Sequence, residues 1–536
     1  MKTKLAAVLS AFLAGALMPP SSAAPIPVNL PDCAIVRPSG SKVPKVVDYA
    51  VEELRAHLLL VSGVDIPVAT GTPPPGKFPI YVGITPAGDT AHMEPEEARW
   101  RVTAGGIWLY GEDKDAAGDT VRDTALNNDS HPGTLFAVYE FLEKQAGITW
   151  IEPGAAGTVY VEKNTLAPEA GSGAWHPRLL QRKIRLAYQD DMRAMAREDN
   201  NIPPGLQFSD PEYEGRQLDE RVWMRRMRMG SSIHLSYGHA FTQWWAKYGA
   251  THPEYFALNK NGQRKPVTAG APDRVKLCVS NPDVAKQVAH DHFFRDDGSK
   301  KNIKDIGYNI NAIENDSRNY CRCENCMALD VVLPGEENLD IDDRVLSDRY
   351  VHFANAVLAE GRRIFDEHYA QEPGESSGKV QVLFYAYSRY NFPPRREKLN
   401  DGVFLFLIPN LAVPLAELDQ YYLDWKNMGA KNAFLRPNDL CQDTGMPIGF
   451  ESHMFEKYRM GSQRLSLLGT DYDTCWGFWP TTGITNYIMA RAMYRPDRPM
   501  SDWDDEYFAA YGAASGDMRN YYNYWRQIWN DRIMKN

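Results

Sequence analysis

From Arg178 onward, short apolar runs alternate with longer runs of helical periodicity over roughly 350 residues of this 536-residue chain. Helical spacing is found at Asp283–Phe294, Asp343–Tyr369, Pro414–Met428 and Gly483–Ala492. This order and length favour an α/β fold built as a (β/α)8 TIM-like barrel, with Ser232–Ser236 as its weakest strand. The eight predicted strands are Leu179–Leu186, Ser232–Ser236, Val275–Val279, Asp305–Ile313, Val380–Tyr385, Val403–Ile408, Ala433–Arg436 and Thr474–Phe478.

A shorter α/β pattern precedes the barrel segment. Amphipathic helices are predicted at Lys45–Val61 and Gly133–Ala146, and a strand at Phe78–Ile84. Arg99–Val102 and Ile107–Tyr110 flank glycines and are predicted to form a hairpin. We therefore expect a small α/β domain over residues 25–172, and the barrel with C-terminal helices over residues 173–536.

Residues 1–24 have the pattern of a secretory signal peptide. Lys2 and Lys4 precede the apolar run Leu5–Leu17, which is followed by the small-residue stretch Pro19–Ala24. No later stretch reaches the length of about 18 apolar residues that a membrane span needs. We expect an exported protein, periplasmic or extracellular, without membrane insertion.

Charge and composition narrow the class of partner. The chain has a formal net charge of -10, so nucleic acid is not expected as its main partner. A hydrophobic content of 43% with 24% charged residues is typical of globular proteins. We found no phosphate loop, nucleophile elbow or dinucleotide fingerprint, and we expect no cofactor.

The seven cysteines are too few for disulfides to be the framework of the fold. Three of them, Cys321, Cys323 and Cys326, form a C-x-C-x-x-C cluster. A disulfide, a metal site and reduced buried thiols are all compatible with this spacing, and the identity of a metal is unknown. Zinc would need a fourth ligand from elsewhere in the chain.

Polar side chains follow the predicted strands, where the active site of a barrel enzyme is built. Glu314 and Asp316 follow the fourth strand, and their alternation predicts that both point to one face as candidate catalytic carboxyls. In the structural alternative, Asp316 caps a turn and Glu314 pairs with an arginine. The candidate substrate-binding residues are His239, Asn281, Tyr385, Tyr387, Asn438, Asp439 and Trp476.

Carboxylates, amides, a histidine and aromatic rings together are suited to carbohydrate. Cleavage of a glycosidic bond needs an acid to protonate the departing oxygen, and an anion or internal nucleophile to support the sugar cation. The same residues would also serve a non-catalytic glycan-binding barrel, because fold does not fix activity.

Two stretches resemble known families. Gly133–Glu143 with Gly147–Trp150 resembles the accessory domain that precedes the barrel in hexosaminidases and α-glucuronidases. His252–Leu258, Leu277–Pro282 and Asn315–Asp316 with Tyr320–Cys326 resemble a bacterial domain family long of unknown function, which includes glycoside hydrolase family 163.

Members of family 163 are endo-β-N-acetylglucosaminidases of N-glycans that retain configuration by substrate assistance. The resemblance therefore implies a secreted glycoside hydrolase that cleaves a β-linked N-acetylhexosamine, with a glycan or glycoprotein as its partner. Asp316 matches the family motif, whereas Glu314 is inferred from strand geometry. The accessory domain also leaves open a glycosidase that uses two protein carboxylates on a uronic acid or another hexose.

Overall fold

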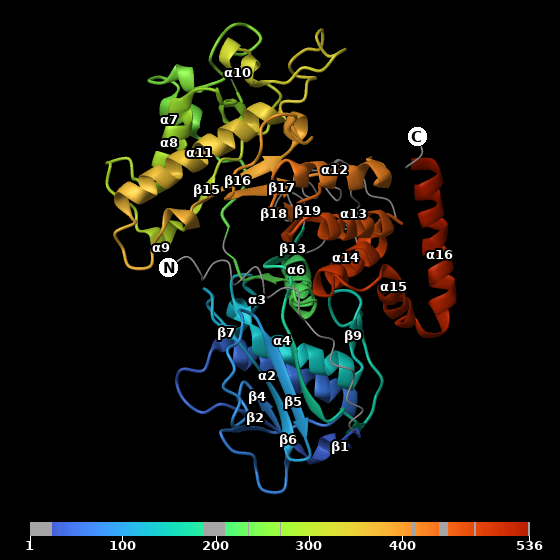
Figure 1. The fold of residues 1–536 in the computed structure, drawn as a ribbon. Coiled ribbons are helices and arrows are strands. Elements are labelled where there is room, and N and C mark those ends of the chain that lie inside the picture. The colour runs from blue at the N-terminus through green and yellow to red at the C-terminus, as the bar shows by residue number, and fades with distance from the viewer. Residues whose placement is uncertain are drawn as a thin grey trace. The chain divides into compact units, whose positions relative to one another are not determined.

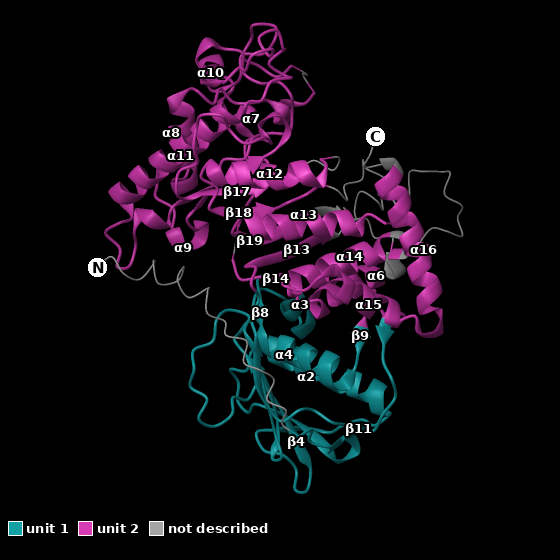
Figure 2. Ribbon diagram, turned by 45° about the vertical axis from the view of Figure 1, so that its right-hand side comes forward, with its two compact units in different colours: residues 1–149, 158–177 teal, residues 150–157, 178–536 magenta. Residues whose placement is uncertain are grey.

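The computed structural model describes residues 24–186, 210–233, 235–267, 270–409, 413–438, 449–475 and 479–533. These residues form two compact units, one from residues 1–149 and 158–177 and the other from residues 150–157 and 178–536 (Figure 2). The predicted signal peptide, apart from Ala24, and the candidate residues Asp439 and Trp476 lie outside the described residues. No helix in the described ranges is long and apolar enough to cross a membrane.

The first unit is built on a six-stranded mixed sheet in the order β12-β5-β6-β4-β2-β3. Its strands are β2 (Cys33–Arg37), β3 (Val68–Thr70), β4 (Phe78–Val82), β5 (Ala98–Thr103), β6 (Gly106–Gly111) and β12 (Gly171–Trp175). β5 pairs antiparallel with β6 and β12, which confirms the predicted hairpin, and the other pairs are parallel. Short elements complete the unit: β1 (Val28–Asn29), β7 (Asp113–Lys114), α3 (Val121–Leu126), β8 (His131–Pro132), β10 (Thr158–Val159) and β11 (Thr165–Leu166).

Helices α2 (Lys45–Ser62) and α4 (Gly133–Phe141) pack against each other and against this sheet (Figure 1). The predicted helix to Ala146 is confirmed, with its last turn in π form at Leu142–Ala146. α2 ends where Gly63 adopts a left-handed conformation. Gly111 and Gly133 let two backbone segments meet, because a Cβ at either position would overlap backbone atoms near the other.

The second unit contains a seven-stranded sheet in the order β14-β13-β19-β18-β17-β16-β15. The pair β14–β13 is antiparallel and the remaining strands run parallel. Within the described residues the sheet is a half-barrel with β14 and β15 at its edges. The strands are β13 (Gln181–Leu186), β14 (Gly230–Ser231), β15 (Asn309–Asn311), β16 (Gln381–Ala386), β17 (Val403–Leu407), β18 (Asn432–Leu435) and β19 (Leu467–Cys475).

Two predicted strands are wrong. Val275–Val279 is not a strand, and only Leu277 makes an isolated bridge, to Phe256. Ser232–Ser236 is not a strand in its described residues, because Ser231 Oγ bonds both the carbonyl and the amide of Ile233 and turns the chain. A closed eight-stranded barrel is therefore not observed in the described residues.

Two other predicted strands have different bounds. The predicted Asp305–Ile313 is only Asn309–Asn311, because Asn302 caps the short helix α9 (Ile303–Ile306) before it. Asn311 Oδ1 then accepts a hydrogen bond from the Ile313 amide and ends the extended segment. The predicted Thr474–Phe478 begins earlier, as β19, and residues 476–478 lie outside the described residues.

The predicted helices are confirmed within a few residues. α11 contacts α8 and β16, and α13 contacts α12 and α14 (Figure 1). The helices of this unit are α6 (Asp210–Arg226), α7 (Trp244–Tyr248), α8 (Pro282–Phe293), α9, α10 (Glu324–Leu329), α11 (Ser347–His368), α12 (Leu415–Asn427), α13 (Glu451–Arg464), α14 (Trp479–Tyr494), α15 (Met500–Ala509) and α16 (Ser515–Ile528).

Candidate active site

An aromatic cluster fills one face of the parallel sheet. Phe406 stacks on Phe434 with ring centroids 4.9 Å apart, and Tyr385 lies 5.5 Å from Phe406. Tyr237 contacts the same Phe406 ring at 4.8 Å. The half-buried Tyr387 packs against this cluster. The two tyrosines predicted from the fifth strand therefore lie together on the inner face of the half-barrel.

A charged group lies on the same face, close to these rings. The carboxylate of Asp471 is fully buried and accepts hydrogen bonds from Arg185 Nε at 3.0 Å and Nη2 at 2.5 Å. Arg436 Nε lies 3.5 Å from the same carboxylate, and its guanidinium stacks 5.0 Å above the Tyr385 ring. Arg436 also donates to Asn438 Oδ1 at 3.3 Å. Sequence reasoning predicted Asn438 but missed Asp471, because the predicted eighth strand began too late.

His239 joins this face to the segment that carries the predicted carboxyls. Its ring lies 6.5 Å from the Tyr385 ring. Its Nδ1 lies 2.6 Å from the backbone carbonyl oxygen of Glu314, so Nδ1 carries the proton and donates. The neighbouring amide of Ala240 donates to the carbonyl of Ile313 at 2.9 Å. Two of the predicted substrate contacts, His239 and Tyr385, thus lie near each other, and His239 contacts the backbone of Glu314.

The buried side chain of Asn315 holds the segment Glu314–Asp316 in place through hydrogen bonds. It is 1% exposed, and its Nδ2 donates to the carbonyls of Phe241 at 3.0 Å and Val275 at 2.8 Å. Its Oδ1 accepts from the Phe241 amide at 3.2 Å. The asparagine of the Asn315–Asp316 pair therefore holds three chain segments together and leaves Asp316 at the surface.

Glu314 is buried and paired. Its side chain is 1% exposed, and its Oε2 lies 3.2 Å from Nζ of the equally buried Lys276. Its Oε1 accepts a hydrogen bond of 2.9 Å from the Leu277 amide. Burial raises the pKa of the Glu314 carboxyl, and the nearby Lys276 ammonium opposes part of that rise. The structural alternative predicted an arginine as the partner of Glu314, but the partner is Lys276. Lys276 is the one charged residue in the apolar run Val275–Val279.

This raised pKa predicts a pH dependence. Glu314 binds its proton more tightly in the folded than in the unfolded protein, so its contribution to stability is full below about pH 4.5 and is lost as pH rises through its folded pKa. Over this pH range, the free energy of unfolding of the wild type relative to Glu314→Gln should fall by about 1.4 kcal/mol for each unit by which folding raises the pKa of Glu314. Urea unfolding of both proteins from pH 4 to 8 measures this, and parallel curves would contradict it.

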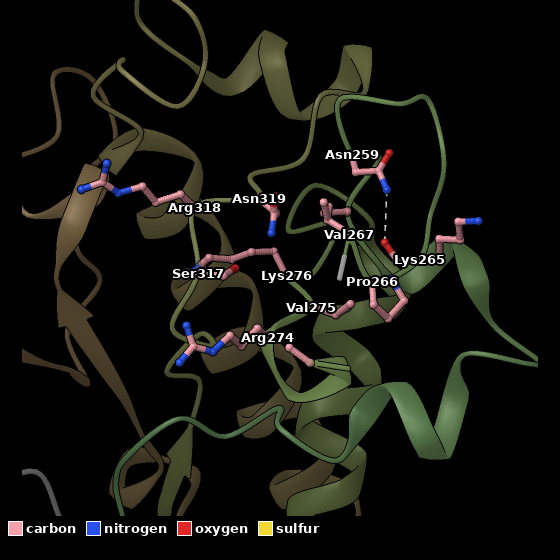
Figure 3. A pocket seen from close by; sticks show the side chains of 12 residues that line it. Asn259, Lys265, Pro266, Val267, Arg274, Val275, Lys276, Ser317, Arg318 and Asn319 are labelled. Carbon is pink, nitrogen blue, oxygen red and sulfur yellow. Dashed lines mark hydrogen bonds between the residues drawn. The ribbon is translucent and has the colours of Figure 1, made fainter. Parts of the chain in front are cut away.

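Asp316 is exposed, and the three residues that follow it, Ser317, Arg318 and Asn319, line a pocket of about 220 Å³. Lys276 also lines this pocket, and its Nζ lies 3.2 Å from the Glu314 carboxylate. Figure 3 shows Arg274 and Arg318 on one side of the pocket and Lys265 on the other. Among the described residues that line it, none is acidic.

Two other sets of predicted residues have structural contacts. Asn281 caps α8, because its Oδ1 accepts a hydrogen bond from the Asp283 amide at 3.0 Å. Its Nδ2 donates to the Glu254 carbonyl at 3.2 Å.

Cys278, which sequence reasoning had set apart, lies with Cys321, Cys323 and Cys326 in one cluster, and all four are free thiols in the structure. Their sulfur atoms lie within 4.8 Å of one another.

Residues 176–428 match one family model. Its description is "Domain of unknown function (DUF4838)". The match spans β13 to α12 and includes Glu314, Asp316 and all four clustered cysteines. No curated protein matches the chain significantly.

Solved structures with similarity to this chain include three enzymes. The Flavobacterium johnsoniae chitobiase FjGH20 is 12% identical, covers 91% of this chain and 70% of its own, and gives a TM-score of 0.42. The GH20 β-N-acetylhexosaminidase of Streptomyces coelicolor A3(2) is 12% identical, with coverage of 93% and 95% and a TM-score of 0.40. The GH115 4-O-methyl-α-glucuronidase BtGH115A is 11% identical with a TM-score of 0.46; 94% of this chain is covered, and it spans 62% of that enzyme.

Proposed function

We propose that this protein is a secreted glycoside hydrolase that cleaves a β-linked N-acetylhexosamine in glycans with assistance from the substrate's own acetamide. The observation that carries the proposal is the segment Glu314–Asp316. It follows a parallel strand and presents an exposed carboxyl two residues from a buried one with a raised pKa. The resemblance to the family that includes glycoside hydrolase family 163 supports the same activity, and it is the basis for proposing an endo-β-N-acetylglucosaminidase.

The two carboxyls have the separate properties that this chemistry needs. Burial raises the pKa of the Glu314 carboxyl, which is the direction of shift that a general acid needs. Asp316 has the exposure of a group that meets the substrate. We assign Glu314 to protonation of the departing oxygen, and Asp316 to orienting the acetamide whose oxygen attacks the anomeric carbon. In this assignment Lys276 moves off the Glu314 carboxyl when substrate enters.

The surrounding side chains give the proposed sugar site its walls. The exposed His239 ring stands beside the buried Tyr385 ring, which carries the Arg436 guanidinium, and His239 Nδ1 is already committed to the Glu314 carbonyl. In the neutral imidazole the second nitrogen, Nε2, is then an acceptor for a sugar hydroxyl. Asp439 and Trp476 remain proposed substrate contacts, as do Tyr387 and Asn438. We propose further that the half-barrel is part of a complete (β/α)8 barrel.

A comparison of two substrates tests this mechanism. We expect hydrolysis of a β-N-acetylglucosaminide and loss of turnover with the matched glucosaminide, in which the acetyl group is absent and no internal nucleophile exists. Initial rates of purified protein on both compounds measure the effect. Equal turnover would contradict substrate assistance.

A glycosidase for uronic acids is a second candidate, and the pocket beside Asp316 favours it. Lys265, Arg274 and Arg318 line this pocket in a chain whose net charge is -10. Such a concentration of cations in an acidic protein suits a carboxylated sugar. If this candidate is right, Arg274→Gln with Arg318→Gln should raise KM for a uronide and leave KM for a neutral glycan unchanged.

A further inference from the structure

The four cysteines Cys278, Cys321, Cys323 and Cys326 have the geometry of a tetrahedral metal site. Cys278 Sγ lies 3.6 Å from Cys323 Sγ and 3.9 Å from Cys326 Sγ. Four sulfur ligands at about 2.3 Å from a tetrahedral zinc ion lie about 3.8 Å from one another. We propose that these four thiolates bind one zinc ion. The proposal goes beyond the glycosidase activity and does not depend on it.

The cluster is enclosed, which distinguishes a structural from a catalytic metal site. Cys278, Cys321 and Cys326 are at most 3% exposed, and Cys323 is half-buried. Four protein ligands complete a tetrahedron and leave no position for water or substrate. The zinc therefore holds the fold and takes no part in the reaction.

Groups around the sulfurs are arranged to stabilise thiolates. The Leu258 amide donates to Cys321 Sγ at 3.2 Å, and Ser280 Oγ lies 3.0 Å from Cys326 Sγ. The positively charged Arg264 guanidinium lies near Cys278 and Cys323. One zinc with four thiolates carries a net charge of about −2, and hydrogen-bond donors and a cation next to the ligands offset that charge.

The metal would connect segments that lie far apart in sequence. Cys323 immediately precedes α10, and Cys278 comes from 45 positions earlier. The Cys278 amide also donates to the Tyr255 carbonyl, and the Arg322 amide to the Leu258 carbonyl. Leu277, next to Cys278, donates its amide to Glu314. Zinc at this place therefore fixes the backbone that orients the buried carboxyl.

Metal content and thiol state of the full chain, purified after export without reductant or added metal, test the proposal. We expect one zinc per chain by elemental analysis, and four thiols that react with a mercurial reagent only as that zinc is released. Cobalt exchanged into the protein should show the visible absorption of a tetrahedral tetrathiolate site. Chelation should lower the unfolding temperature.

Variants identify the ligands. Cys278→Ser should lose the zinc, whereas Cys33→Ser, which changes a buried thiol of the first unit, should keep one per chain. Because a ligand variant can fail to fold, the thiol and cobalt measurements on the wild type test the proposal independently. Disulfides among the four cysteines without zinc, zinc retained in Cys278→Ser, or stoichiometric iron in place of zinc would each overturn it.

Discussion

Asp316→Asn is expected to lower kcat/KM for glycan cleavage by about 10²–10⁴-fold. The amide keeps the size of the carboxylate but loses the charge that orients the acetamide and supports the developing cation. Because Asp316 is exposed and Asn315 holds the segment, the variant should fold with unchanged stability. Initial rates on an N-acetylglucosaminide, together with thermal unfolding, measure both effects.

The chain offers a matched control for this substitution. Asp305 is also an exposed aspartate, on α9, at the opposite end of β15. Asp305→Asn makes the same chemical change at a place where the proposed site does not reach, so its kcat/KM should equal that of the wild type. A similar loss in both variants, or no loss in Asp316→Asn, would remove Asp316 from the site.

The second large effect is expected from Lys276→Met. Removing one partner of a buried ion pair leaves an uncompensated charge, which typically costs about 3–5 kcal/mol of stability. Lys276 and Glu314 are both buried, and Lys276 also donates to the Asn315 carbonyl at 2.5 Å. The variant should unfold at lower urea concentration, and its Glu314 should titrate at still higher pH because the opposing ammonium is gone.

A double substitution separates the ion pair from general packing. Lys276→Met combined with Glu314→Gln removes both charges and should recover part of the lost stability. Lys286→Met changes an exposed lysine on α8 and should be nearly neutral. If the double variant is no more stable than Lys276→Met, the Lys276–Glu314 pair is not what the substitution broke.

Local periodicity in the sequence was sufficient to predict much of this fold. Helices such as α2 follow from apolar residues at helical spacing, and β16 and β17 follow from continuous apolar runs that are buried on both faces of a parallel sheet. The bounds of these helices and strands depended on side chains that form hydrogen bonds with the backbone. Asn311 ended β15 early, so Glu314 and Asp316 lie beyond the strand and do not share a face by strand alternation.

The candidate site depended on contacts between distant segments, which periodicity does not reveal. Val275–Val279 has the apolar pattern of a buried strand, but it contains Lys276, whose buried ammonium pairs with the Glu314 carboxylate. Cys278 appeared isolated in sequence and lies beside Cys323 and Cys326 in the structure. The charged residue within a buried apolar run was an indication that sequence reasoning left unused, and the fourth ligand that a zinc site would need was not assigned to Cys278.

Product analysis by mass spectrometry tests the central claim most directly. The purified protein and its Asp316→Asn variant would be incubated with high-mannose and complex N-glycoproteins, mucin and uronic-acid polysaccharides. We predict release by the wild type, and not by the variant, of intact glycans that carry one N-acetylglucosamine at the reducing end. Release of uronic acids alone would establish the second candidate instead. Glycan binding by the wild type with no product from any substrate would contradict a hydrolase.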